Sequence, residues 1–193
     1  MIPGHFATNH SHINYYIDLT TLKARQNEAQ AAARLLAYYS HYSIVDTIVC
    51  LDGSEVIGAF LARHLAKKEV FSVNSNKNIN VVTPEYDSNG QLIFRDNLTP
   101  MIVGREVLIL ISTVNSGKSA RRTLECVQYY GGKVQGIAAI FSMLEQVDGI
   151  PVYSLFSPDD IAGYISSSPK ECPMCRAGQK IDALANSFGL SML

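Results

Sequence analysis

The sequence predicts an α/β fold with a mainly parallel central sheet flanked by helices. Short runs of β-branched and aliphatic residues alternate with segments of helical periodicity, and turns rich in Gly, Asp and Ser separate them. Strand–helix alternation at this short spacing requires crossover connections, which place helices on both faces of a parallel sheet. The chain has 193 residues, of which 47% are hydrophobic, and this is enough for one domain with a substantial core.

The first half of the chain contains two helical segments around a short strand. Apolar residues at helical spacing between Leu22 and Tyr39 predict one long amphipathic helix. The run "DTIVCL" predicts a strand, and "DGSEVIGAFLARHLA" predicts a tight turn and a helix with Ser54 as its cap. Residues 79–96 then read as two strands around "DSNG", which indicates a hairpin or flap.

The second half repeats the alternation. "REVLILI" predicts a buried strand, the segment after Gly117 predicts a helix that stops at Gly131 and Gly132, and "KVQGIAAIFS" and "PVYSLF" predict two further strands. Ligands of parallel sheets bind at the carboxyl ends of the strands. The turns "LDGSE" and "STVNSGKS" are therefore the candidate ligand sites.

The loop from Asn115 to Ser119 has the chemistry of a phosphate site. It offers backbone N–H groups, hydroxyls and the positive end of a helix to an anion. The alternative is a plain strand-to-helix turn with Ser119 as the cap. A nucleoside triphosphatase loop is disfavoured, because Ser112 stands where that motif requires its first glycine.

Charge and composition exclude several classes of protein. With 16 Lys and Arg against 17 Asp and Glu, the net charge of −1 indicates no nucleic-acid or anionic-membrane partner. No window approaches the length of a membrane span and the N-terminus has no signal-peptide pattern, so we expect a cytoplasmic protein. Repeated tyrosine pairs are typical of core edges or subunit contacts, and they favour a homodimer.

Cysteine and histidine form two separate groups. Cys172 and Cys175 have metal-ligand spacing, but a closed Zn²⁺ site needs four ligands, and the pair alone also fits a redox pair, a reduced structural knuckle or a site shared by two chains. His5, His10 and His12 could bind a metal, line a ligand pocket or be ordinary satisfied or surface histidines.

Three separated motifs resemble the orotate phosphoribosyltransferase family in the same order. The matching N-terminal positions are Gly4, His5, Phe6, His12, Tyr16 and Asp18, in "GHFATNHSHINYYID". Asn115, Ser116 and Gly117 occupy the Thr-Thr-Gly places of the family's phosphoribosyl-pyrophosphate motif, and "CPMCRAGQKID" is similar to the Cys-Pro-x-Cys-x-x-Gly tail of one branch.

The resemblance implies a type I phosphoribosyltransferase fold as a single domain over 1–193, with a small hood built from 1–20 and possibly the 168–193 tail. It implies Mg²⁺-dependent binding of phosphoribosyl pyrophosphate, or of a nucleoside monophosphate, and of a pyrimidine base such as orotate, in pyrimidine nucleotide metabolism. It assigns phosphate binding to Ser112, Thr113, Val114, Asn115, Ser116, Gly117, Lys118 and Ser119, the pyrophosphate turn to Asp52, Gly53 and Ser54, and the base pocket to Phe6, His10, His12 and Tyr16.

Three departures from the family pattern concern charge and base recognition. Ile111 and Ser112 replace the two acidic residues that hold the ribose, Tyr86 stands near where the flap carries a Lys, and His10-Ser11 replaces a Ser-Gly pair. Carboxylates beside a developing sugar cation contribute strongly to transfer. Two hypotheses follow: a transferase acting on orotate or another base, and a non-catalytic sensor that binds a nucleotide or sugar phosphate.

Overall fold

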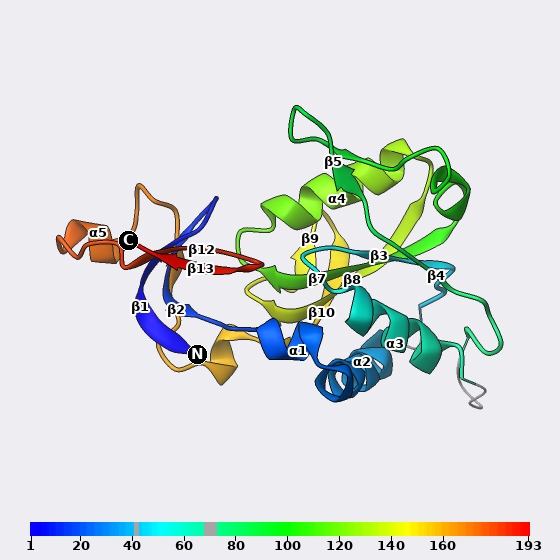
Figure 1. The fold of residues 1–193 in the computed structure, drawn as a ribbon, viewed down its shortest axis with the longest axis horizontal. Coiled ribbons are helices and arrows are strands. Elements are labelled where there is room, and N and C mark those ends of the chain that lie inside the picture. Colours follow the sequence, from blue (N-terminus) through cyan, green and yellow to red (C-terminus); the bar gives the residue numbers. More distant parts are fainter. Residues whose placement is uncertain (41–42, 68–72) are drawn as a thin grey trace.

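The computed structural model describes residues 1–40, 43–67 and 73–193. Its main sheet has six strands in the order β4-β3-β7-β8-β10-β9, and all neighbours are parallel except β9 and β10 (Figure 1). The strands are β3 (Thr47–Cys50), β4 (Asn80–Val82), β7 (Glu106–Val114), β8 (Lys133–Ser142), β9 (Gln146–Val147) and β10 (Ile150–Phe156). The predicted α/β fold with a mainly parallel sheet is confirmed.

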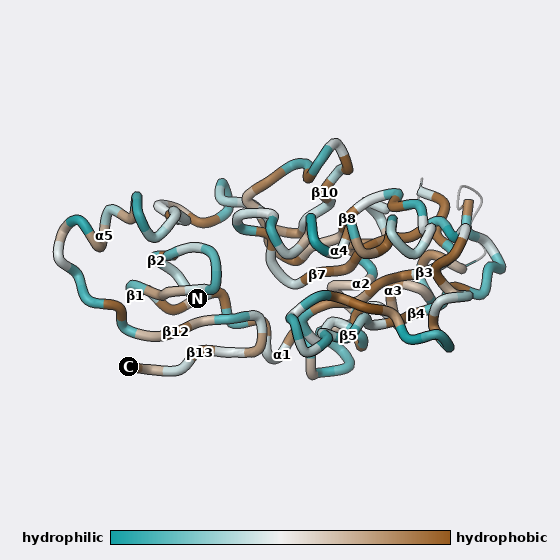
Figure 2. The backbone as a smooth tube through the Cα atoms, turned by 90° about the horizontal axis from the view of Figure 1, so that it is seen from above, coloured by the Kyte–Doolittle hydropathy of each residue, from teal (hydrophilic) through white to brown (hydrophobic). Residues whose placement is uncertain are grey.

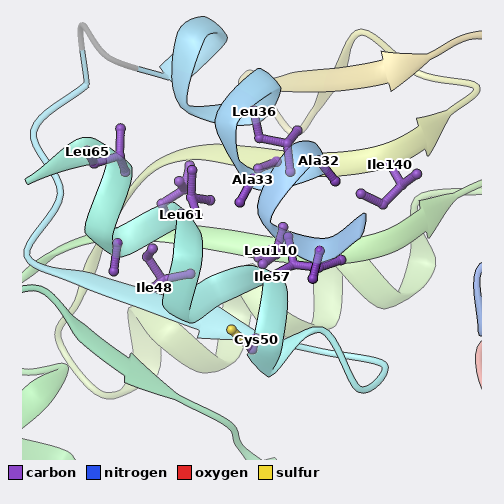
Figure 3. Close-up of a cluster of buried hydrophobic side chains, with 14 of the residues drawn as sticks. Ala32, Ala33, Leu36, Ile48, Cys50, Ile57, Leu61, Leu65, Leu110 and Ile140 are labelled. Carbon is purple, nitrogen blue, oxygen red and sulfur yellow. The ribbon is translucent and has the colours of Figure 1, made fainter. Parts of the chain in front are cut away.

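Helices cover both faces of this sheet, because alternate residues of its strands point to opposite sides. Leu108 and Leu110 of β7 pack in one cluster with α2 (Gln26–Ser40) and α3 (Glu55–Leu65), whose side chains are shown in Figure 3. Ile109 and Ile111 pack on the other side against α4 (Lys118–Tyr129). Figure 2 shows the hydrophobic character of β7, which is buried on both faces.

The prediction of one helix from Leu22 to Tyr39 is wrong. The chain forms α1 (Thr20–Ala24) and then α2, with an extended residue, Arg25, between them (φ −96°, ψ 124°). Small residues allow α2 to pack closely in the core, and Ala29 and Ala33 are fully buried. The break gives α1 its own direction and places Lys23 at the end of the sheet.

The predicted hairpin over 79–96 is correct in part. Its first strand, β4, belongs to the main sheet and lies parallel to β3. The hairpin itself is shorter and consists of β5 (Glu85–Tyr86) and β6 (Leu92–Ile93), which project from the upper edge in Figure 1. A 3₁₀ turn, η1 (Thr99–Met101), leads back to β7, which continues beyond its predicted end to Val114.

Both chain ends join in a second sheet, which we call the hood (Figure 1). Its order is β11-β2-β1-β12-β13, and β1 and β12 pair in parallel although they lie at opposite ends of the sequence. The elements are β1 (Ile2–Ala7), β2 (His12–Tyr16), η2 (Pro158–Asp160), β11 (Ser166–Ser167), α5 (Pro173–Arg176), β12 (Ala183–Asn186) and β13 (Gly189–Met192). The hood has a small apolar core around Phe6 and Ile13. Among the described residues, no helix combines the length and apolar character needed to cross a membrane.

Candidate ligand-binding site

A cavity of about 160 Å³ lies between the hood and the carboxyl end of the main sheet. Four stretches line it: 8–11 between β1 and β2, residues within 13–20 from β2 into α1, 111–120 from β7 into α4, and 185–187 from the β12–β13 hairpin. Lys23, Asp52 and Tyr164 contribute further polar groups. The cavity therefore lies where ligands of parallel sheets bind, and the hood closes it from the opposite side.

Gly117 forms the turn between β7 and α4. It adopts the left-handed conformation (φ 74°, ψ −3°) at the N-cap position of α4. The backbone angle favours glycine, and a Cβ atom at this position would lie 2.9 Å from Leu144 Cδ1, so the Leu144 side chain would have to shift. The alternative, a turn with Ser119 as the cap, is wrong in its cap, because the N-cap is Gly117 and no described side chain caps α4. The first backbone N–H groups of α4 remain free for an anion.

The remaining residues of the predicted phosphate loop have different environments. Thr113 and Val114 are the last residues of β7, and Val114 is buried in the core. Ser112 is 2% exposed and lines the cavity, yet its hydroxyl has no hydrogen-bond partner among the described residues. Ser116 and Lys118 also line the cavity and are exposed.

Positive charge gathers around this turn. Lys118 is the first residue of α4, and Arg122 lies one turn further along. Burial lowers the pKa of His10, and the positive charges of Lys118 and Arg122 lower it further. A negatively charged ligand group placed beside His10 would meet both cations.

Tyr164 fixes one side of the phosphate loop and was not predicted. Its hydroxyl donates a hydrogen bond to Asn115 Oδ1 at 3.0 Å, and its ring packs edge-on against Phe141 at 4.9 Å. Burial raises the pKa of Tyr164 to about 12, so the hydroxyl stays a donor. Nothing in the sequence marks this residue, since it lies in an irregular segment whose position depends on the hood.

The turn after β3 is stabilised by hydrogen bonds from the protein's own side chains. Asp52 (φ 60°) and Gly53 (φ 73°) are both left-handed. Ser54 is the N-cap residue of α3 as predicted, but its hydroxyl donates to the Leu110 carbonyl at 3.3 Å and makes no capping hydrogen bond to the helix. Lys23 Nζ donates to the carbonyl oxygens of Asp52, at 2.9 Å, and Ser187. Of the predicted pyrophosphate turn, Asp52 lines the cavity and its two neighbours do not.

Asp52 brings a carboxyl group to the sheet edge beside β7. Burial raises its pKa, and this effect outweighs the hydrogen bond from Ser187, the nearby Lys23 ammonium and the hydrogen bond from the Ser112 backbone N–H. The last contact places the carboxyl group next to Ser112, one of the two positions where the resembled family carries an acid.

The predicted base-pocket residues divide into two pairs. His10 and Tyr16 line the cavity. Phe6 and His12 do not, which corrects their assignment: Phe6 is 2% exposed in the hood core, and the ring of His12 contacts His5. Phe6 pairs with Ile13 and packs in the hood core, whereas His12 pairs with Ala7 and lies on the opposite face of the hood sheet with His5, because alternate side chains point to opposite faces.

The cations near the predicted flap are engaged elsewhere. Arg95 pairs with Glu85 across the β5–β6 hairpin at 2.8 Å, and Lys77 pairs with Asp46 at 2.8 Å. Tyr86 is 64% exposed. None of these residues lines the cavity.

A second polar cluster lies on the far side of the hood sheet. It consists of His5, His12, Cys172 and Cys175, which we call the His/Cys cluster, and its four candidate ligand atoms lie within 4.8 Å of one another. Burial raises the pKa of the Cys172 thiol, but hydrogen bonds from the Cys175 backbone N–H and the His12 ring outweigh it and lower the pKa to about 6. His5 was predicted only as a candidate, and the sequence did not indicate that it meets the cysteines.

Comparisons with known proteins agree with the resemblance in the sequence. No family model matches the chain. The chain is 22% identical to orotate phosphoribosyltransferase of Chlorobium phaeobacteroides over 187 residues, which is 95% of this chain and 88% of that protein. A shorter stretch of 66 residues, 33% of the chain and 31% of the relative, is 33% identical to the transcriptional regulator GfcR of Haloferax volcanii.

The fold comparison leads to the same group of proteins. The structure of Mycobacterium tuberculosis orotate phosphoribosyltransferase in complex with 5-phospho-α-D-ribosyl 1-diphosphate aligns with a TM-score of 0.56 at 16% identity, over 75% of this chain and 82% of that chain. At this identity the match concerns the fold. The chain has the type I phosphoribosyltransferase fold and resembles orotate phosphoribosyltransferases in sequence over nearly its whole length.

Proposed function

We propose that the protein binds a 5′-phosphorylated ribose, as phosphoribosyl pyrophosphate or a nucleoside monophosphate, in the cavity between the hood and the main sheet. The observation that carries this proposal is the left-handed Gly117 turn, which opens α4 into the cavity without a side-chain cap among the described residues. The free amides and the helix dipole favour an anion at this point.

The cations and the size of the cavity support a sugar phosphate. Lys118 lines the cavity beside the free amides of α4. The volume of about 160 Å³ is below the roughly 300–1,000 Å³ that is typical of sites for drug-sized ligands. A compact phosphorylated pentose suits this space, with the base directed toward the hood residues His10 and Tyr16.

The ribose hydroxyls would meet Ser112 and Asp52. The Ser112 hydroxyl is buried without a described partner, and a buried polar group in that state costs free energy until a ligand satisfies it. Asp52 lies beside it through the Ser112 backbone N–H. Together they place a hydroxyl and a carboxyl group near the positions of the family's missing acids.

Asp52 is also the one carboxylate that lines the described part of the cavity. Mg²⁺ is commonly held by one or two carboxylates together with ligand phosphates. The residues present therefore suit a Mg²⁺ ion that binds together with a pyrophosphate. In that role Mg²⁺ would screen the ligand's charge from the Asp52 carboxylate.

A non-catalytic binding module is the second candidate. Two observations favour it. Ile111 and Ser112 carry no charge to stabilise a sugar cation. Lys23 donates a hydrogen bond to the Asp52 carbonyl, in the turn where the family binds pyrophosphate. The partial match to a protein named as a transcriptional regulator is in line with this candidate. Under it the ligand is a monophosphate, which needs the Gly117 turn alone.

Calorimetry with a ligand series tests the proposal. Ribose 5-phosphate should bind and ribose should not; equal or absent binding of both would refute it. Phosphoribosyl pyrophosphate and orotidine 5′-monophosphate, each with and without Mg²⁺, separate the two candidates. Mg²⁺-dependent binding of the donor, with loss of orotate absorbance when orotate is added, indicates a transferase. Metal-independent binding of the monophosphate without turnover indicates a binding module.

A further inference from the structure

We infer that His5, His12, Cys172 and Cys175 form a closed structural Zn²⁺ site that joins the two ends of the chain. The cluster lies outside the ligand cavity, and its residues come from β1, β2 and the segment around α5. Two His and two Cys are a common ligand set of structural zinc. This inference does not depend on the proposed ligand.

Four of the six distances between the ligand atoms are close to the edges of a tetrahedron around one zinc ion, and the other two are within 4.8 Å. Zn–N bonds of about 2.0–2.1 Å and Zn–S bonds of about 2.3 Å give tetrahedral edges of about 3.3–3.8 Å. His5 Nε2 lies 3.0 Å from His12 Nδ1, and Cys175 Sγ lies 3.3 Å from His12 Nδ1. Both sulfur atoms lie 3.6 Å from His5 Nε2. Small adjustments bring all four atoms to bonding distance of one point.

The surroundings of His5 prepare its ring for a metal. Its Nδ1 lies 3.0 Å and 3.1 Å from the backbone carbonyls of Gln179 and Lys180. A carbonyl can only accept, so Nδ1 carries a proton, and Nε2 is the ring nitrogen that faces the cluster and can bind a metal. Metal-bound histidines usually donate their other N–H to a carbonyl or carboxylate in this way.

Burial makes the cluster costly without a metal. His5 and Cys172 are fully buried and His12 is 8% exposed, while Cys175 lies at the surface. Without a metal, both thiols and the His12 ring crowd around the single Nε2 atom of His5 in a small buried space. A zinc ion satisfies all four groups at once, and the exposed Cys175 leaves a path by which it can enter.

The hood also needs a cross-link more than the main sheet does. Its core contains five buried residues: Phe6, Ile13, Tyr16, Ala183 and Ala185. Cores of this size rarely hold a small unit together without a metal or disulfides. Ligands at 5 and 12 and at 172 and 175 are far apart in sequence, so one ion would fix the non-local pairing of β1 with β12.

Metal content and spectroscopy of the full chain test this inference. Protein purified under reducing conditions without chelators should contain one zinc per chain, and zinc returned to chelated protein should bind with an apparent Kd below about 0.1 μM. Cobalt in its place should give the visible bands of a tetrahedral site and a near-ultraviolet thiolate charge-transfer band. A folded, reduced chain that takes up no zinc would overturn the inference, as would a Cys172–Cys175 disulfide in the freshly purified protein.

Single substitutions identify the ligands. Cys175→Ser and His12→Asn should each weaken zinc binding at least 100-fold, while Cys126→Ser and His10→Asn, which change the same residue types outside the cluster, should keep one zinc per chain. If a ligand variant fails to fold, hydrogen exchange of the wild-type chain with and without zinc is measured instead. Removal of zinc should then accelerate exchange in β1, β2 and β12 and leave β7 and β8 protected. Retention of zinc by both ligand variants, or no change in the hood on removal, would contradict the site.

Discussion

The turns after β3 and β7 lie side by side at the same edge of the main sheet, but they differ in whether the protein's own side chains bind their backbone groups. Both reverse the chain through left-handed residues, Asp52 with Gly53 in one and Gly117 in the other. In the first turn Lys23 binds the Asp52 carbonyl, and Phe188 lies near Gly53. In the second no described side chain caps α4. The first turn is closed by the protein's own side chains, and the second is open to a ligand.

This difference shows that two turns with similar backbone geometry can have different chemical roles. In the resembled family both turns serve the same ligand, one for its phosphate and one for its pyrophosphate. Here the backbone of both turns is suited to that task, but a lysine from α1 and the β12–β13 hairpin cover one of them. A strand-to-helix turn therefore indicates a possible anion site, and its neighbours decide whether an anion can reach it.

Of the substitutions that test this comparison, Gly117→Ala should have the largest effect on stability. A left-handed alanine costs about 1–2 kcal/mol, and the contact with Leu144 adds about 1–3 kcal/mol, so we expect the free energy of unfolding to fall by about 2–5 kcal/mol. Urea unfolding measures the change. Gly90→Ala is the matched control, because Gly90 has the same φ of 74° and nothing within 4 Å of its Cβ position, and it should lose only about 1–2 kcal/mol. Equal losses would mean that Leu144 moves aside freely.

Ser116→Asp should weaken binding of ribose 5-phosphate by tenfold or more. The residue lines the open turn, and a carboxylate there would repel the phosphate by about 1–4 kcal/mol at close range. Calorimetry measures the affinity, and Ser116→Asn, which has nearly the same shape without the charge, should bind within about threefold of wild type. Unchanged affinity in the aspartate variant would show that the phosphate does not bind at this turn.

The strands and both turns could be predicted from the sequence because their signals are local. "REVLILI" is apolar enough to be buried on both faces, and Gly117 follows in the short polar stretch after it. The features that failed or were missed depend on distant partners. The break at Arg25, the Tyr164–Asn115 hydrogen bond and the position of Lys23 all depend on where the hood sits.

The His/Cys cluster illustrates the same limit. The sequence indicated both cysteines and the nearby histidines, but as separate groups, since 159 residues lie between His12 and Cys172. Their meeting depends on the parallel pairing of β1 with β12, which brings opposite ends of the chain together. Local periodicity carries no information on such a pairing. Alternation along β1 and β2 also explains the two corrected base-pocket residues: His12 lies on the face opposite the hood core, and Phe6 is enclosed within that core.

Lys23→Met tests whether the closed turn depends on its lysine. The change keeps much of the apolar length but removes both hydrogen bonds, and we expect a loss of about 1–2 kcal/mol in the free energy of unfolding. Hydrogen exchange should also become faster in the β12–β13 hairpin, which Lys23 connects to the turn through Ser187. The exposed Lys170→Met variant controls for the loss of one charge. If the hairpin exchanges at the wild-type rate, the hood closes the turn by packing alone.

Asp52→Asn should have the smallest effect and a distinct pH dependence. Burial raises the pKa of this carboxyl group in the folded state, so its ionised form costs the fold free energy above that pKa. The cost disappears as the pH falls through the raised pKa, and wild-type stability should gain there relative to the variant. Asparagine tolerates left-handed backbone and carries no charge, so at pH 7 we expect a rise of roughly 2 °C in Tm. The advantage of the variant should shrink toward acid pH in thermal scans between pH 4 and pH 8.

Asp96→Asn, at an exposed position, should show neither effect. A variant that is less stable than wild type at pH 7 would mean that the Asp52 carboxylate stabilises the closed turn, and the contrast with the open turn would then rest on charge pairing as well as on the Lys23 contact.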